Sequence, residues 1–310
     1  MSNRPIVISG FGRSGTTWLS DIISKAAGGL ILFEPYHPSV CRSSGKICYT
    51  VNAIDITNEL ISQWNHVAQK HNPDRWLLRN HLRSPIEQLP QSYIDDIWEH
   101  CDVIGFKSIR VNHSIMPLVD ALSAQLVYII RHPLTVISSI IGRPRFWKEF
   151  GWSWHWDSFS NRAIYPRYSP DQVAKLMKLL SDEDDSLGRI AVMWLISADI
   201  TIPQVEATGG MVIHYEDLYV NPYGTAKSIL RHLNLRSDLH PAYLFEPSMT
   251  TLNTFHNSRS GLDKADLLHM FTRDRLSPTA ADRLMRLLHE VADLLQITAI
   301  PIRSYLNSFI

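Results

Sequence analysis

The chain has 310 residues, enough for one large α/β domain with its own core, and we expect a single domain over residues 1–310. Its 30 basic and 30 acidic side chains cancel, which disfavours nucleic acid as a partner because such binders carry a basic excess. No apolar stretch approaches the ~18 residues of a membrane span, so none is expected. Three cysteines without CxxC spacing and the absence of a signal-peptide pattern predict reduced thiols and a cytoplasmic location.

The stretch from residue 5 to 23, PIVISGFGRSGTTWLSDII, organises the first part of the chain. A short apolar run ends at Gly10, a glycine-rich loop continues to Gly15, and apolar residues then recur at helical spacing. This pattern predicts a buried strand, a tight loop and the start of a helix. Such a loop turns backbone N–H groups toward one point at the positive end of the helix dipole, which suits a phosphate or sulfate.

The spacing from Gly10 to Gly15 is that of a nucleotide P-loop, but Thr16 stands where an NTPase has lysine. The positive charge comes earlier, at Arg13, so the loop can hold a phosphate without the usual triphosphate and metal apparatus. The alternative is a plain glycine–serine turn. Arg13 followed by Thr16 and Thr17 favours the anion site.

The segment GFGRSGTTWL resembles the 5′-phosphosulfate loop of the sulfotransferases that use 3′-phosphoadenosine-5′-phosphosulfate (PAPS). The resemblance implies PAPS as cofactor, PAP as product and no metal. It also implies a P-loop-like doubly wound α/β fold with a central parallel sheet flanked by helices. It assigns cofactor binding to Arg13, Ser14, Gly15, Thr16, Thr17 and Trp18.

A second strand is predicted at 30–33 and ends at Glu34-Pro35. A carboxylate in this position lies at the edge where open α/β sheets bind ligands, although an isolated glutamate is usually a surface residue. The segment LFEP resembles the carbohydrate sulfotransferases, and this resemblance implies that Glu34 is the catalytic base.

A third strand at 103–106 is followed by Lys107 and Arg110, again at the ligand edge. The segment FKSIR resembles a Lys-x-x-Arg segment of the carbohydrate sulfotransferases. Two interpretations stay open: the side chains line the acceptor site, or they form surface ion pairs.

The apolar run at 126–130 predicts a buried central strand, with Arg131 at its end and Pro133 in the first turn of the next helix. Arginine matches a terminal phosphate through two parallel hydrogen bonds. In the sulfotransferases that the chain resembles, an arginine at this position and a serine eight residues later bind the 3′-phosphate. The resemblance assigns these roles to Arg131 and Ser139.

Aromatic residues crowd the stretch 143–170, where Trp152 and Trp154 are candidate acceptor contacts. The stretch is either a lid that excludes water or a hydrophobic cluster under a long loop. Further along, a strand at 211–214 leads to Tyr215, which by the resemblance contacts the adenine. A loose match in the segment 246–262 assigns the closure over the 3′-phosphate to Ser258, Arg259 and Gly261.

Helices are predicted at 57–71 with Thr57 as N-cap, and at 113–124, 190–202, 223–234 and 278–296. The resulting hypothesis is a sulfotransferase that moves the sulfuryl group from PAPS to a hydroxyl of a carbohydrate, small-molecule or lipid acceptor. Glu34 would take the acceptor proton, and Arg13 would stabilise charge on the transferring group. Two alternatives stay open: a P-loop kinase or NTPase, and a non-catalytic PAP-binding protein.

Overall fold

The computed structural model describes residues 4–37, 40–41, 48, 54–68, 75–78, 89–142, 152–180, 186–235, 240, 244, 264–272 and 274–307. Within these ranges five strands form one sheet in the order β2-β3-β1-β4-β5, and every pair is parallel. The strands are β1 Ile6–Gly10, β2 Leu30–Phe33, β3 Val103–Ser108, β4 Gln125–Ile130 and β5 Met211–His214. The five strands predicted from the sequence are confirmed.

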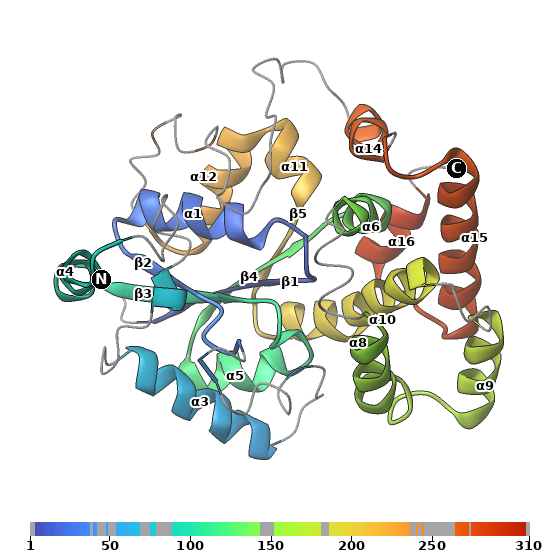
Figure 1. Cartoon of the computed structure of the whole chain (residues 1–310), viewed down its shortest axis with the longest axis horizontal. Helices are drawn as coiled ribbons and strands as arrows, with labels where there is room; N and C mark the ends of the chain where they lie inside the picture. Colours follow the sequence, from blue (N-terminus) through green and yellow to red (C-terminus); the bar gives the residue numbers. More distant parts are fainter. Residues whose placement is uncertain are drawn as a thin grey trace.

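Helices cover both faces of the sheet (Figure 1). One face carries α1 Thr16–Ala27, α11 Tyr215–Val220 and α12 Pro222–His232, and the other carries α3 Ile54–Ala68 and α5 Ile115–Leu122. Side chains of β1 alternate between the two layers: Ile6 and Ile8 pack with α1, whereas Val7 packs on the opposite side. The fold is therefore a doubly wound, P-loop-like α/β arrangement around a central parallel sheet.

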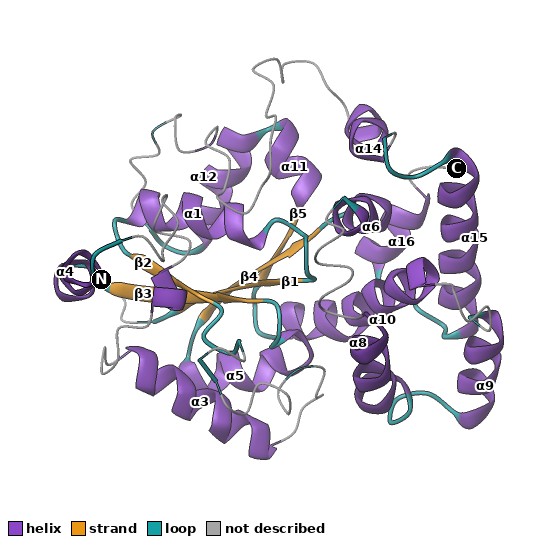
Figure 2. Cartoon of the chain, viewed as in Figure 1, coloured by secondary structure: helices purple, strands orange, loops and turns teal. Residues whose placement is uncertain are grey.

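The remaining helices lie mostly beyond the carboxyl ends of the strands, apart from α4 at the β2–β3 edge (Figure 2). They are α4 Gln91–His100, α6 Pro133–Ile141, α8 Trp152–Phe159, α9 Pro170–Leu179, α10 Ser186–Ala207, α14 Lys264–Thr272, α15 Pro278–Leu294 and α16 Ile300–Asn307. Short 3₁₀ helices occupy Arg75–Leu78 and Asn112–Ser114, and a π-helical turn spans Ser160–Ile164.

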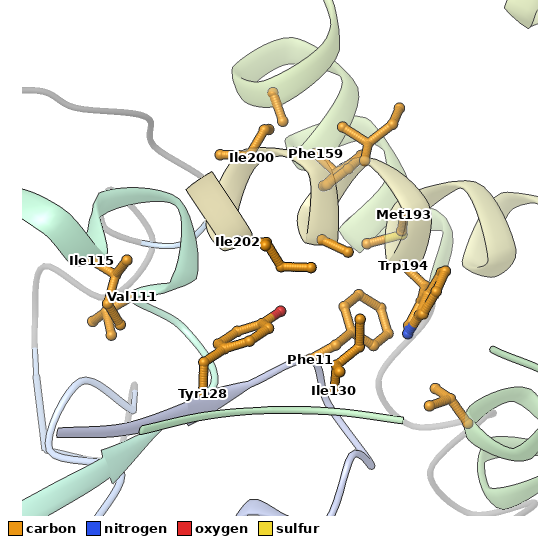
Figure 3. Close-up of a cluster of buried hydrophobic side chains, with 14 of the residues drawn as sticks. Phe11, Val111, Ile115, Tyr128, Ile130, Phe159, Met193, Trp194, Ile200 and Ile202 are labelled. Carbon is orange, nitrogen blue, oxygen red and sulfur yellow. The ribbon is translucent and has the colours of Figure 1, made fainter. Parts of the chain in front are cut away.

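The long helix α10 runs through the core beside the sheet (Figure 3). Its Trp194 is 1% exposed, and Met193, Ile200 and Ile202 are also buried. By length and composition alone α10 could cross a membrane, but 78% of its apolar window is buried inside the protein, as expected for a core helix.

Two of the predicted helices differ from the structure in how they begin or how they are built, and α10 extends beyond the predicted 190–202 at both ends. Helix α3 begins at Ile54, so Thr57 lies inside the helix and the prediction that it is the N-cap is wrong. The helix predicted at 113–124 is a 3₁₀ turn followed by α5, which ends at Leu122 because Ser123 adopts a left-handed conformation (φ 49°). The predicted helices at 190–202, 223–234 and 278–296 correspond to α10, α12 and α15.

Candidate anion-binding site

The loop between β1 and α1 has a backbone conformation that gathers N–H groups. Arg13 (φ 72°) and Gly15 (φ 96°) are both left-handed, and the Ser14 N–H donates to the Phe11 carbonyl at 3.0 Å. Glycine is required at position 15 because a Cβ would lie 2.5 Å from a ring carbon of Tyr215 and would strain the backbone.

The first turn of α1 is open toward this loop. Gly15 occupies the N-cap position, and within the described chain no side chain caps the helix. The fully buried Ser14 hydroxyl has no hydrogen-bond partner among the described residues. Free helix N–H groups at the positive end of the dipole together with an unpartnered buried hydroxyl suit an anion with several acceptor oxygens.

The side chain of Asn112 holds the start of the loop in place through a hydrogen bond to Gly10. The side-chain amide of Asn112 donates to the Gly10 carbonyl at 3.0 Å, and the backbone carbonyl of Asn112 accepts from the Thr201 hydroxyl of α10 at 3.2 Å. The Ser9 hydroxyl also contacts the Asn112 side chain. Sequence reasoning missed Asn112 because nothing in its neighbourhood signals a contact with a loop 102 positions away.

Three predicted site residues lie together beside the loop. Arg131, at the end of β4, donates from Nε to the Thr135 hydroxyl at 2.9 Å and from Nη1 to the Arg13 carbonyl at 3.2 Å. Arg13 in turn donates from Nε to the Ser139 hydroxyl at 3.1 Å. The structure therefore places Arg131 and Ser139 against the loop that the sequence identified.

The charge of Arg131 has no carboxylate partner in the part of the chain that the structure describes. The residue is 8% exposed, and no carboxylate in the described ranges forms an ion pair with it. Two of its five N–H donors are used by Thr135 and Arg13, which leaves three for a ligand. A buried guanidinium without a counter-charge is costly, so its presence beside the loop indicates an anion site.

Two aromatic rings contact the Arg131 guanidinium. Its Cζ lies 4.2 Å from the ring centroid of Tyr215 and 4.9 Å from that of Phe271. Tyr215 is 6% exposed, and its ring also contacts Trp18 edge-on. A role for Tyr215 in binding adenine stays a prediction; in this structure its ring packs on Arg131.

Glu34 and Lys107 form a buried ion pair at the same edge of the sheet. Arg110 Nε lies 3.8 Å from the second oxygen of Glu34, and Lys107 Nζ lies 4.1 Å from the Phe33 ring centroid. Glu34 is left-handed (φ 43°), which is strained for a glutamate. Lys107 thus pairs with Glu34 in the interior, and the half-buried Arg110 lies close to the same carboxylate.

This ion pair and the loop belong to one electrostatic unit. Burial lowers the pKa of Lys107, the Glu34 carboxylate opposes that effect, and the charges of Arg13 and Arg110 lower it further. Lys107, Arg110 and Arg13 therefore lie within electrostatic reach of one another and of the Glu34 carboxylate at the carboxyl ends of the strands. This excess of positive charge favours an anionic ligand.

A second network of buried hydrogen bonds, centred on Glu216, holds the backbone next to Arg131. The carboxylate of Glu216 accepts from the His132 N–H at 3.0 Å and from the Tyr305 hydroxyl at 2.6 Å. The His132 ring nitrogen Nδ1 accepts from the Leu134 N–H at 3.2 Å and caps α6, which starts at Pro133. The predicted start of this helix is confirmed, whereas the roles of Glu216 and Tyr305 were not anticipated.

His132 should make the fold sensitive to acid. Burial, with Arg131 beside it, lowers the pKa of His132 to about 3, whereas an unfolded histidine titrates near about 6.5. Between these values the unfolded state binds more protons, so the free energy of unfolding falls as the pH drops. His132→Asn keeps an N-cap acceptor but has no group that titrates in this range. Between pH 7 and 5 we expect its free energy of unfolding to fall by about 2 kcal/mol less than that of the wild type. Urea unfolding at both pH values measures this, and equal losses would contradict it.

The aromatic stretch is part of the core where it is described. Trp156 and Phe159 of α8 are buried, and Phe159 packs edge-on against His113. For these two residues the hydrophobic-cluster interpretation is confirmed. Trp152 and Trp154 lie on α8, but their side chains are outside the described set, as are Ser258, Arg259 and Gly261 entirely.

The first strand of the parallel sheet leads through a glycine-containing loop into α1, whose N-terminus has no side-chain cap in the described chain. This arrangement is that of a P-loop-like α/β protein with a candidate anion site. The sequence pattern of the sulfotransferase family matches residues 5–238, which is most of the chain. The chain belongs to the sulfotransferase family, and this membership supports a sulfotransferase enzyme.

Solved structures similar to this chain include three sulfotransferases. The sulfotransferase domain from the curacin biosynthetic pathway is 15% identical, with 95% of this chain and 98% of that chain covered and a TM-score of 0.43. A sulfotransferase from Alicyclobacillus acidocaldarius is 12% identical, with 98% and 100% covered and a TM-score of 0.44. A mouse sulfotransferase complexed with PAP is 13% identical, with 100% and 90% covered and a TM-score of 0.44. A comparison with curated protein sequences finds no match.

Proposed function

We propose that the protein transfers a sulfuryl group from PAPS to a hydroxyl of an acceptor. The observation that carries the proposal is the buried Arg131, whose unused N–H groups lie beside the loop and have no carboxylate partner in the described ranges. A triphosphate site would need a lysine where Thr16 stands. A second, separate phosphate group would account for the buried Arg131 beside Arg13 of the loop.

The residues present fit PAPS as the donor, which would supply the sulfuryl group. The Ser14 hydroxyl and the backbone N–H groups of the first turn of α1 would bind the 5′-phosphosulfate, and the charge of Arg13 in the same loop would favour it. The remaining N–H groups of Arg131 and the Ser139 hydroxyl are available for the 3′-phosphate. Arg13 contacts both Arg131 and Ser139, so the two subsites share one residue.

On the acceptor side we assign the proton-accepting role to Glu34. Its carboxylate lies next to the Lys107 ammonium, and its left-handed backbone stores strain at a strand end, as functional residues often do. Lys107 and Arg110 hold this carboxylate, while Arg13 stabilises negative charge that develops during transfer. The acceptor is a carbohydrate, small-molecule or lipid alcohol, and the LFEP segment supports the carbohydrate branch.

Titration calorimetry with PAP and with ADP, each with and without Mg²⁺, tests the cofactor. We expect metal-independent PAP binding that is much tighter than ADP binding and that Arg131→Ala weakens about 10²-fold, because charged hydrogen bonds are lost. Arg303→Ala removes the same charge from a half-buried arginine paired with the exposed Asp293 and should leave PAP binding unchanged. Equal affinity for PAP and ADP, or a Mg²⁺ requirement, would overturn the proposal in favour of a kinase or NTPase.

A further inference from the structure

We propose that Phe271 of α14 is a positioning residue that gives Arg131 its selectivity for a 3′-phosphate. This inference rests on the proposed function. Phe271 lies beyond residues 5–238, the part of the chain that matches the family pattern. It reaches Arg131 because α14 packs over α6 and α11.

The rings of Tyr215 and Phe271 both contact the Arg131 guanidinium. Its Cζ is 4.2 Å from the Tyr215 centroid and 4.9 Å from the Phe271 centroid, and the two rings are 6.2 Å apart at 61°. At these distances the rings meet the guanidinium from two adjacent sides rather than sandwiching it. These contacts restrict the guanidinium, and among the described residues only two of its five N–H donors are used, by Thr135 and Arg13.

Phe271 is hydrogen-bonded to α6, the helix that carries Ser139. The Ser138 hydroxyl donates to the Phe271 carbonyl, and Arg275 Nη1 donates to the Ser138 carbonyl at 3.2 Å. Ser138 is adjacent to Ser139 on α6, and the Phe271 ring also packs edge-on against Tyr219 at 5.5 Å. The hydrogen bond from Ser138 to the Phe271 carbonyl therefore links the position of the Phe271 ring to that of Ser139, the next residue on α6.

Removing the ring should affect only ligands that use Arg131. A cation–π contact with a desolvated guanidinium is strong enough to matter for affinity, and leucine keeps apolar volume without the ring quadrupole. Without Phe271 the guanidinium gains freedom, which must be lost again when it binds a phosphate. A ligand that lacks the 3′-phosphate does not depend on this ordering.

The test compares two nucleotides that differ by the 3′-phosphate alone, PAP and adenosine 5′-phosphate (AMP), in competition calorimetry. For Phe271→Leu we expect PAP affinity to fall about 10-fold while AMP affinity changes less than about 2-fold. Phe271→Tyr keeps the ring and should retain the wild-type ratio. Tyr219→Leu removes a neighbouring ring that contacts Phe271 and Trp18, and it should also keep the ratio.

The ratio of the two affinities is internal to each variant, so partial unfolding cannot mimic the expected result. A wild-type ratio in Phe271→Leu would overturn the role of Phe271 while leaving the proposed function intact. A wild-type protein that binds PAP and AMP equally would overturn the proposed function, and the inference with it. An equal fall for both nucleotides in Phe271→Leu would show a general structural role and would also overturn the inference.

Discussion

Replacing Glu34 with glutamine is expected to lower turnover by about 10²–10⁴-fold, the usual contribution of a well-placed general base. Glutamine has nearly the same shape but cannot take the acceptor proton. Because Glu34 contacts Lys107 and Arg110 rather than the loop, the substitution removes a negative charge but no ligand for the nucleotide, so PAP affinity should not fall. Steady-state transfer to an accepted alcohol, measured beside PAP calorimetry, checks both parts. Near-full turnover in Glu34→Gln would contradict the assignment of the base.

The same substitution also leaves a buried lysine without its partner, which costs about 3–5 kcal/mol of folding free energy. The double variant Glu34→Gln/Lys107→Met removes the unpaired charge and should regain much of this stability. Turnover in the double variant should stay low. Thermal melts of the single and double variants separate the loss of stability from the loss of chemistry, and a double variant as active as wild type would show that Glu34 is structural only.

The second large effect concerns Trp194, where alanine is expected to lower the free energy of unfolding by about 3–5 kcal/mol. The indole is 1% exposed, it lies in the core between α10 and the sheet (Figure 3), and it packs edge-on against Tyr305 at 6.2 Å. Its Nε1 also donates to the Arg131 carbonyl at 3.0 Å. Urea unfolding of the purified variant measures the cost.

Trp194→Phe separates packing from the hydrogen bond. Phenylalanine keeps most of the apolar volume but leaves the Arg131 carbonyl without its donor, so we expect a loss of about 1–3 kcal/mol. PAP binding should weaken in this variant because the backbone that carries Arg131 is less well fixed. A cost below about 1 kcal/mol for Trp194→Ala would contradict the view that this side chain ties α10 to the site.

The parts of the fold that the sequence predicted well are those with local signals. Each strand of the sheet is a short, mostly apolar run, and β1 and β2 are bounded at both ends by glycine, proline or a charged residue. Helix α9 has a local signal as well, the capping box of Ser169 and Gln172 with Pro170 in the first turn, but it was missed. Helices α14 and α16 are short and carry weak patterns, so their positions depend on tertiary packing.

For the site, sequence reasoning identified side chains that follow strand ends, since parallel strands end at one edge. Arg13, Arg131 and Ser139 indeed meet there. It did not pair Glu34 with Lys107, because the register that sets Phe33 beside Lys107 is a property of the folded sheet. The roles of Phe271 and Tyr305 could not be predicted, because hydrophobic residues on late helices carry no sign of their distant partners.

The contacts that build the site join residues far apart along the chain, and this affects how the protein folds. Arg13 and Ser139 are separated by 126 positions, Gly10 and Asn112 by 102, and Ile130 and Tyr305 by 175. Long-range contacts close large loops and therefore form late. A collapsed chain that already holds its helices would still lack the assembled site, so we expect nucleotide affinity to be regained in the last stage of refolding.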